Sequence, residues 1–240
     1  MTTITDSERT QRAPAFAATD DAGARLAAAM GVAFVALSVA STFAAGAPPA
    51  SDASAAKVAA FFHDHSGGIR AQLLLGALGL AALIWWFGAL WRTLSRAEHE
   101  RPRLAVVAAV GLTVGAALAM VNGVVVATAA LRAGDAATTR LFFTFSLVAI
   151  SAAGFGIGTF LLAANTVAYR EHLTPVWVSV LGFIAAVAFF VAGLGTISDA
   201  PAYNVAGLVA FFVWCVWIVA VSVTMWRSAD ARAAGALAGR

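Results

Sequence analysis

Two histidines and a carboxylate stand together at His63, Asp64 and His65, and these residue types are suited to binding a transition metal. Residues two apart on a helix point in different directions, so His63 and His65 could share an ion only on an extended backbone. Two ligands also leave a tetrahedral site incomplete. We therefore expect a solvated helix end here, with a metal site at His63 and His65 as the weaker alternative.

Polar residues inside the long apolar runs are the second place where a site could form. They are Thr113, Asn122, Ser146, Ser151, Thr159, Asn165 and Ser179. In hydrocarbon such side chains hydrogen-bond between helices, at roughly 0.6–2 kcal/mol each. They also line cavities where they converge. We expect interhelical hydrogen bonds, and a polar cavity joining Thr113, Ser151 and their neighbours is the alternative.

Ionisable residues are missing from the middle of every apolar run, which argues against an ion-coupled transporter. The chain contains no H-E-x-x-H, G-x-S-x-G, Walker-type or dinucleotide-binding motif. Its basic residues are too scattered for a nucleic-acid-binding face. The sequence therefore predicts no cofactor and no nucleic-acid partner, and it leans away from an enzyme.

The composition places most of this chain in lipid. Apolar residues make up 61% and charged residues 11%, whereas a soluble domain averages about 45–50% and about 25%. Six apolar runs reach or approach the ~20 residues that a membrane-crossing helix needs. They cover residues 26–45, 73–91, 104–131, 141–169, 175–197 and 203–226. The expected fold is all-α, a polytopic transmembrane bundle of about six spanning helices.

The polar ends divide the chain into three parts. Residues 1–24 read as a disordered cytoplasmic tail, 25–227 as the transmembrane domain, and 228–240 as a short cytoplasmic tail. Small residues after the first run leave a cleaved signal peptide as an alternative. The long acidic segment before that run disfavours it.

The basic residues set the orientation. Of the 15 lysines and arginines, all but Lys57, Arg70, Arg132 and Arg140 fall on the side that holds both termini. Positive charge collects on the cytoplasmic side of membrane proteins. Both termini are therefore expected in the cytoplasm.

The first exterior loop, residues 46–70, should contain a short amphipathic helix. Pro48 and Pro49 stop the preceding helix, Asp52 is placed to cap a helix over 53–63, and Gly67 and Gly68 would end it. Its apolar face consists of Val58, Phe61 and Phe62. We expect this helix to lie flat on the outer membrane surface or to cover the end of the bundle.

Small residues should bring helices together, because apolar side chains gain nothing by leaving lipid. Gly111 and Gly115 are four apart in the third run, and Gly154 and Gly158 are four apart in the fourth. We expect the third and fourth helices to pack through these glycines, and homodimerisation through one such face is the alternative.

Four tryptophans lie away from the ends of the runs. They are Trp85, Trp86, Trp214 and Trp217. We expect them between helices rather than in an interfacial belt.

The pattern resembles a group of small uncharacterised actinobacterial membrane proteins with about six helices. The resemblance rests on Pro48 and Pro49, residues 52–54, 58–65 (VAAFFHDH) and 83–90 (LIWWFGAL), 173–177 (LTPVW), Leu181 and Gly182. It implies the topology and a bacterial plasma membrane, and it implies no chemistry.

These observations favour a structural, lipid-interacting or accessory membrane protein that self-associates or joins another membrane protein, with membrane lipids as its surroundings. A channel or transporter for a small or apolar solute is the first alternative. A membrane-embedded metal-dependent enzyme is the second.

Overall fold

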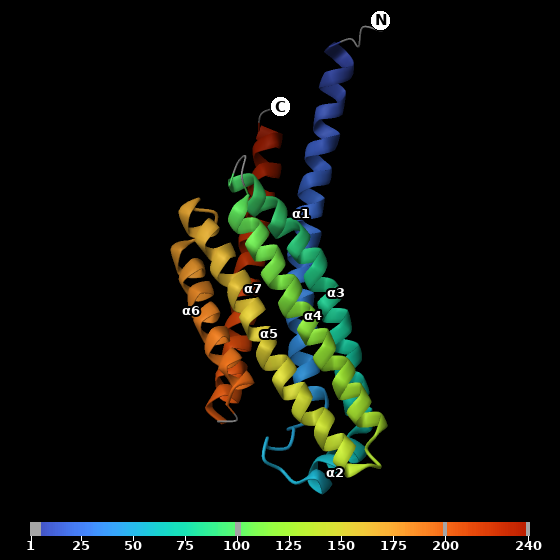
Figure 1. Ribbon diagram of the computed structural model, residues 1–240. Helices are drawn as coiled ribbons and strands as arrows, with labels where there is room; N and C mark the ends of the chain where they lie inside the picture. Colours follow the sequence, from blue (N-terminus) through green and yellow to red (C-terminus); the bar gives the residue numbers. More distant parts are fainter. Residues whose placement is uncertain (1–5, 99–101, 199–200, 239–240) are drawn as a thin grey trace, which may run out of the picture.

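The computed structural model describes residues 6–98, 102–198 and 201–238, with backbone alone for 6–21, 201, 232–233 and 235–238. The described part is helical and contains no strand (Figure 1). Its helices are α1 (Asp6–Ala44), α2 (Ala55–Asp64), α3 (Ser66–Ala97), α4 (Arg103–Leu131), α5 (Ala136–Arg170), α6 (Val176–Gly193), the 3-10 turn η1 (Leu194–Thr196) and α7 (Pro201–Ala238).

Six stretches of the described helices are long and apolar enough to cross a membrane. They are Ala22–Ala44, Ser66–Ala97, Arg103–Leu131, Ala136–Arg170, Val176–Thr196 and Ala202–Ala231. This confirms the all-α, polytopic fold. Helix α1 begins at Asp6, so its backbone is helical inside the segment expected as a disordered tail. The division into tails and membrane domain stays a prediction.

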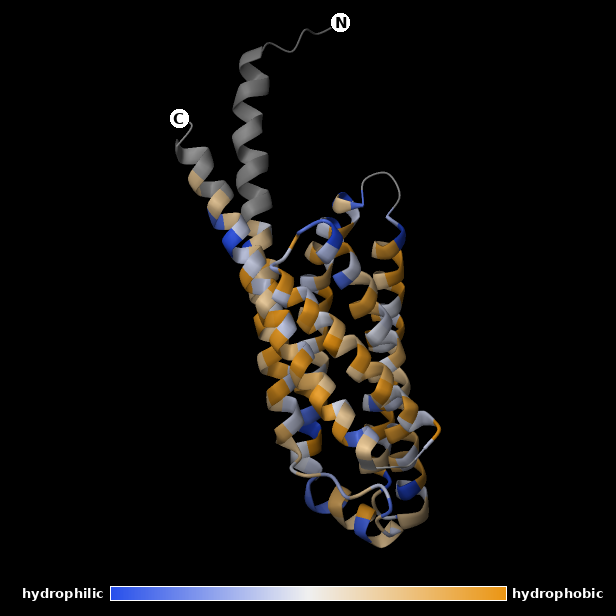
Figure 2. Cartoon of the chain, turned by 90° about the vertical axis from the view of Figure 1, so that its left-hand side faces the viewer, coloured by the Kyte–Doolittle hydropathy of each residue, from blue (hydrophilic) through white to orange (hydrophobic). Residues whose placement is uncertain are grey.

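The spanning helices form a closed ring in which each contacts its neighbours in the order α1, α3, α4, α5, α6, α7 and back to α1. Both termini lie at one end of the bundle, here called the terminal end, and α2 lies at the other, the α2 end (Figure 1). Hydrophobic residues run along the length between these ends, and hydrophilic residues gather towards them (Figure 2).

Aromatic side chains fill the space that the spanning helices enclose. Trp86, Phe160 and Trp217 are almost completely buried, and Trp217 meets the other two edge-on at centroid distances of 5.9 and 5.8 Å. Trp214 is buried beside Phe34 of α1. These three tryptophans lie between helices, as expected.

The expectation for Trp85 is wrong, because its side chain is 69% exposed. Neighbouring residues on a helix are about 100° apart around the axis. Once Trp86 faces the core, Trp85 therefore has to turn towards the outside of α3.

Helix α5 packs against two neighbours through two different sets of glycines. A Cβ atom added to Gly156 would lie 2.5 Å from the backbone nitrogen of Gly115 in α4, and one on Gly111 would lie 2.7 Å from that of Phe160. The glycines of α4 therefore lie against α5, as expected. They are already covered within the chain, which disfavours homodimerisation through them.

The α5 glycines named from the sequence are the wrong ones for this contact. A Cβ atom on Gly154 would lie 2.6 Å from the carbonyl oxygen of Phe189, and one on Gly158 would lie 3.2 Å from that of Ala186, so both face α6. Two residues span roughly 200° around a helix, which places Gly156 on the opposite face.

Helix α2 covers the α2 end of the bundle. Val58 and Phe62 are buried and Phe61 is partly buried, within a small apolar cluster that includes Phe143 of α5. The N-cap is Ser54, whose hydroxyl accepts from the backbone nitrogen of Lys57 at 3.4 Å, and not Asp52.

The end of α2 also differs from the expectation. The helix ends at Asp64, with His65 between it and α3. Gly67 and Gly68 belong to the first turn of α3, where Gly68 lets the backbone approach Ala44 of α1 closely.

Arg140 ties the loop before α2 to α5. Its guanidinium group donates to the carbonyl oxygens of Ser51 at 2.6 Å and Ala53 at 2.8 Å. Helix α2 and the loop before it are thus held against the bundle by both apolar and polar contacts.

Candidate functional site

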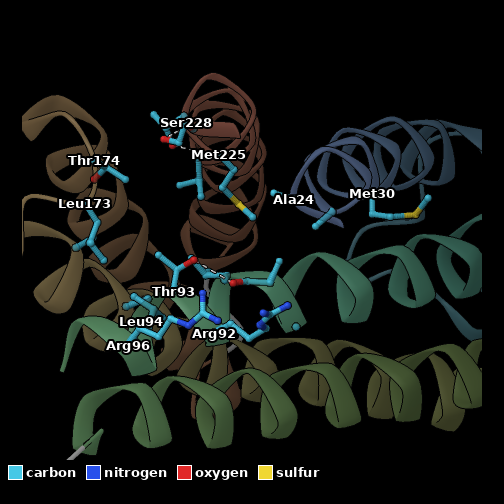
Figure 3. A pocket seen from close by; sticks show the side chains of 18 of the residues that line it. Ala24, Met30, Arg92, Thr93, Leu94, Arg96, Leu173, Thr174, Met225 and Ser228 are labelled. Atoms are coloured by element: carbon cyan, nitrogen blue, oxygen red, sulfur yellow. Dashed lines mark hydrogen bonds between the residues drawn. The ribbon is translucent and has the colours of Figure 1, made fainter. Parts of the chain in front are cut away.

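A pocket of about 850 Å³ lies at the terminal end of the bundle. It is bounded by α1, α3, α5 and α7 and by the segment that joins α5 to α6. Figure 3 shows Met225 and Ser228 of α7 facing Arg92, Thr93 and Arg96 of α3 across it, with residues of α1 and of the α5–α6 segment on either side. We call it the terminal pocket.

The walls of the terminal pocket are largely apolar. They include Leu26, Ala27, Met30, Leu90, Leu173, Val221 and Met225. Two lining residues, Leu26 and Trp85, are 52% and 69% exposed. The pocket is therefore open to its surroundings along α1 and α3, where an apolar ligand could enter from the membrane.

Gly88 has no side chain and so leaves empty space beside the wall of the pocket. It lines the pocket, and a Cβ atom added there would meet no atom within 4 Å outside its own helix backbone. A larger side chain at this position would occupy the pocket without displacing its neighbours.

Asn165 and Trp217 form the inner end of the pocket. The Asn165 side chain is 1% exposed, and its nitrogen donates to the carbonyl oxygen of Leu161 at 2.8 Å. Its oxygen accepts from the indole nitrogen of Trp217 at 2.9 Å. Because Gly182 has no side chain, the carboxamide fits against α6. The two polar side chains at the inner end are therefore hydrogen-bonded to each other, next to apolar walls.

A second buried hydrogen bond lies beside the first. The indole nitrogen of Trp86 donates to the hydroxyl of Ser222 at 3.0 Å, and Gly31 leaves room for both side chains. Trp86 also packs edge-on against Trp217. The bundle beyond the inner end of the pocket is thus filled with aromatic side chains.

The rim of the pocket carries positive charge. Arg92 and Arg96 are one helical turn apart on α3, so they project from the same face. None of the described residues that line the pocket is acidic. Nearby, Arg25 of α1 and Asp230 of α7 form an exposed ion pair at 2.8 Å.

The polar residues proposed from the sequence do not converge on one site. Thr113 is exposed, and its hydroxyl donates to the carbonyl oxygen of Ala109. Ser151 lies beside Gly195 on the η1 side of α5. Asn122 is half-buried in α4. Of the seven polar residues named from the sequence, Asn165 alone lines the terminal pocket. Thr113 and Ser151 therefore do not share a cavity.

Among the described side chains, no further metal-ligating residue joins His63 and His65 at the α2 end. The ring of His65 stacks on Phe61 at 4.6 Å, and its Nδ1 lies 3.1 Å from the Phe61 carbonyl oxygen. Across the described side chains, no three His, Cys, Asp or Glu residues come together in a way that could hold a metal ion.

The sequence did not point to Gly88, Arg96 or Met225 as members of one site. A signal was present in α3, where Trp85, Ala89, Arg92 and Arg96 recur every three or four residues. Reading it as a pocket wall requires the positions of α1 and α7, which periodicity does not supply.

Six apolar helices in a closed ring define this chain as a polytopic α-helical membrane protein. Residues 29–221 match the family described as a domain of unknown function, DUF4386, and the chain belongs to that family. The matched segment contains much of the terminal pocket, including Gly88, Arg96 and Asn165. Comparison with curated proteins and with solved structures gave no match.

Proposed function

We propose that this protein is a non-enzymatic, lipid-interacting component of a bacterial plasma membrane, and that it holds the hydrocarbon part of a membrane amphiphile in the terminal pocket. The observation that carries the proposal is the pocket itself. Its volume of about 850 Å³ falls within the range typical of ligand sites. Its walls are apolar, and the polar pair at its inner end is already hydrogen-bonded.

The chemistry of the lining supports binding rather than catalysis. The described lining residues include no histidine, cysteine or carboxylate, so the pocket offers no acid–base pair or activated nucleophile. The exposed edge at Leu26 and Trp85 gives a lipid a lateral entry, which a water-soluble substrate would not need.

The arginine distribution supports an orientation with both termini in the cytoplasm. The terminal pocket then opens at the level of the inner leaflet. Buried Trp86, Trp214 and Trp217 argue against the alternative of a continuous solute path through the bundle.

Native mass spectrometry of the protein released from phospholipid nanodiscs tests the proposal. The wild-type protein should retain a bound lipid, and Gly88→Leu should lose it, because the leucine side chain would project into the pocket and take up space that the lipid occupies. The matched control is Gly67→Leu, at the other end of α3, where an added side chain also meets open space. Retention of lipid by Gly88→Leu, or its equal loss from both variants, would contradict the proposal.

A further inference from the structure

The terminal pocket combines apolar walls with a cationic rim, and we infer that its ligand is an amphiphile with an anionic phosphate headgroup. This inference rests on the proposed function and adds to it the class of lipid. The acyl chain lies inward, between Met30 of α1 and Met225 of α7, and the phosphate lies at the rim beside Arg96.

Arg96 supplies the donors that a phosphate requires. A guanidinium group is permanently charged and presents paired N–H groups that match two phosphate oxygens. Arg96 lines the pocket and is exposed at its rim.

Two described carboxylates that lie near Arg96 and Ser228 in the chain interact with other groups. Glu98 follows α3, and its two oxygens accept from the backbone nitrogens of Leu104 at 3.0 Å and Ala105 at 2.6 Å. Asp230 pairs with Arg25. The positive potential at Arg96 is therefore not cancelled by a carboxylate lining the pocket.

The hydroxyl groups at the rim do not compete with the arginines as donors. Thr93 donates to the carbonyl oxygen of Ala89 at 3.1 Å, and Ser228 donates to that of Thr224 at 2.8 Å. Recognition of the headgroup thus depends on charge. A zwitterionic headgroup brings its own cation next to the arginines, so an anionic lipid should bind more tightly than phosphatidylcholine.

The test compares Arg96→Gln with Arg103→Gln. Arg103 is exposed at the start of α4, at the same end of the bundle, and it does not line the pocket. Native mass spectrometry in nanodiscs of phosphatidylcholine doped with phosphatidylglycerol gives the occupancy of each lipid. The wild type and Arg103→Gln should prefer phosphatidylglycerol. In Arg96→Gln this preference should be about fivefold weaker, which is the effect of removing one positive charge near the membrane surface. Arg96→Lys keeps the charge and should fall between them.

Inorganic phosphate and glycerol phosphate serve as competitors, and neither should displace the lipid, because they cannot fill the apolar walls. Displacement by either would overturn the assignment to an amphiphile. Equal effects of Arg96→Gln and Arg103→Gln would show surface attraction alone and overturn the inference. Equal wild-type binding of both lipids, abolished by Gly88→Leu, would overturn the inference and leave the proposed function standing. No bound lipid in the wild type would overturn both.

Discussion

The indole nitrogen of Trp217 donates a hydrogen bond to the side-chain oxygen of Asn165 across 2.9 Å, which joins α7 to α5 at the inner end of the terminal pocket. Both side chains are almost completely buried. In hydrocarbon neither group has water as a substitute partner. The pair therefore fixes the position of α7, which forms one wall of the pocket.

Replacing Asn165 with alanine should destabilise the bundle, because the Trp217 N–H group is then buried without its acceptor. We expect the free energy of unfolding to fall by about 1–2 kcal/mol. Asn122→Ala is the matched control, since Asn122 is only half-buried, and it should change stability little. Reversible unfolding in mixed detergent micelles measures both. Equal stability of the two variants would mean that the Asn165–Trp217 bond contributes nothing.

Gly156→Ala should weaken the contact between α4 and α5. The added methyl group would lie 2.5 Å from the backbone nitrogen of Gly115, and a backbone atom cannot rotate away as a side chain can. The expected loss is about 1–3 kcal/mol. Gly88→Ala places the same methyl group in open space within α3 and should raise the unfolding midpoint slightly, because alanine restricts the unfolded backbone more than glycine does. An unaltered midpoint for Gly156→Ala would contradict the close approach of these helices.

Acidification should loosen the start of α5. Hydrogen bonds from the hydroxyl and backbone N–H of Thr138, with smaller contributions from Ala137 and Arg132, hold the pKa of Asp135 below its ordinary value of 3.8. A lowered pKa means that the ionised cap stabilises the folded state above pH 3.8 and that this contribution is lost as the pH falls through the folded-state pKa. The protection of residues 136–139 from hydrogen exchange, measured relative to the intrinsic exchange rate at each pH, should therefore fall at the most acidic pH. Asp135→Asn retains a capping oxygen and should remove that loss of protection, and persistence of the pH effect in Asp135→Asn would assign it to another group.

The orientation can be tested with single cysteines introduced after Cys215→Ala. Asp52 before α2 and Glu171 after α5 are both exposed, at opposite ends of the bundle. Asp52→Cys should react with an impermeant thiol reagent in intact cells, and Glu171→Cys should react only after the membrane is opened. Glu98 is a poorer choice, because its carboxylate caps α4. The reverse labelling pattern would place the terminal pocket in the outer leaflet.

The spanning helices were predictable because long uncharged runs lie in lipid, where backbone groups can form hydrogen bonds only with one another. What composition could not settle was which face of each helix meets which neighbour. Gly154, Gly156 and Gly158 are equally small, and the choice between them for α4 depends on the rotation of α5. Trp85 and Trp86 are likewise the same residue type, and only the placement of the core separates them.

The terminal pocket was beyond sequence reasoning for a related reason. Its lining comes from four helices that are distant along the chain, and several members are ordinary alanines, leucines and methionines. Asn165 was singled out because a polar side chain in an apolar run needs a partner, and it proved to lie at the inner end of the pocket. Arg96 stood out only as one of several arginines near a membrane interface.

Photochemical labelling from the hydrocarbon chain tests the central claim, that the terminal pocket holds lipid, most directly. A phospholipid with a diazirine in its acyl chain would be incorporated with the protein into nanodiscs and irradiated, and the adducts located by peptide mass spectrometry. We expect adducts at Met30 and Met225 in the wild type and in Gly67→Leu, and their disappearance in Gly88→Leu. Absence of label at both methionines in the wild type, or equal label in Gly88→Leu, would contradict lipid binding in the terminal pocket.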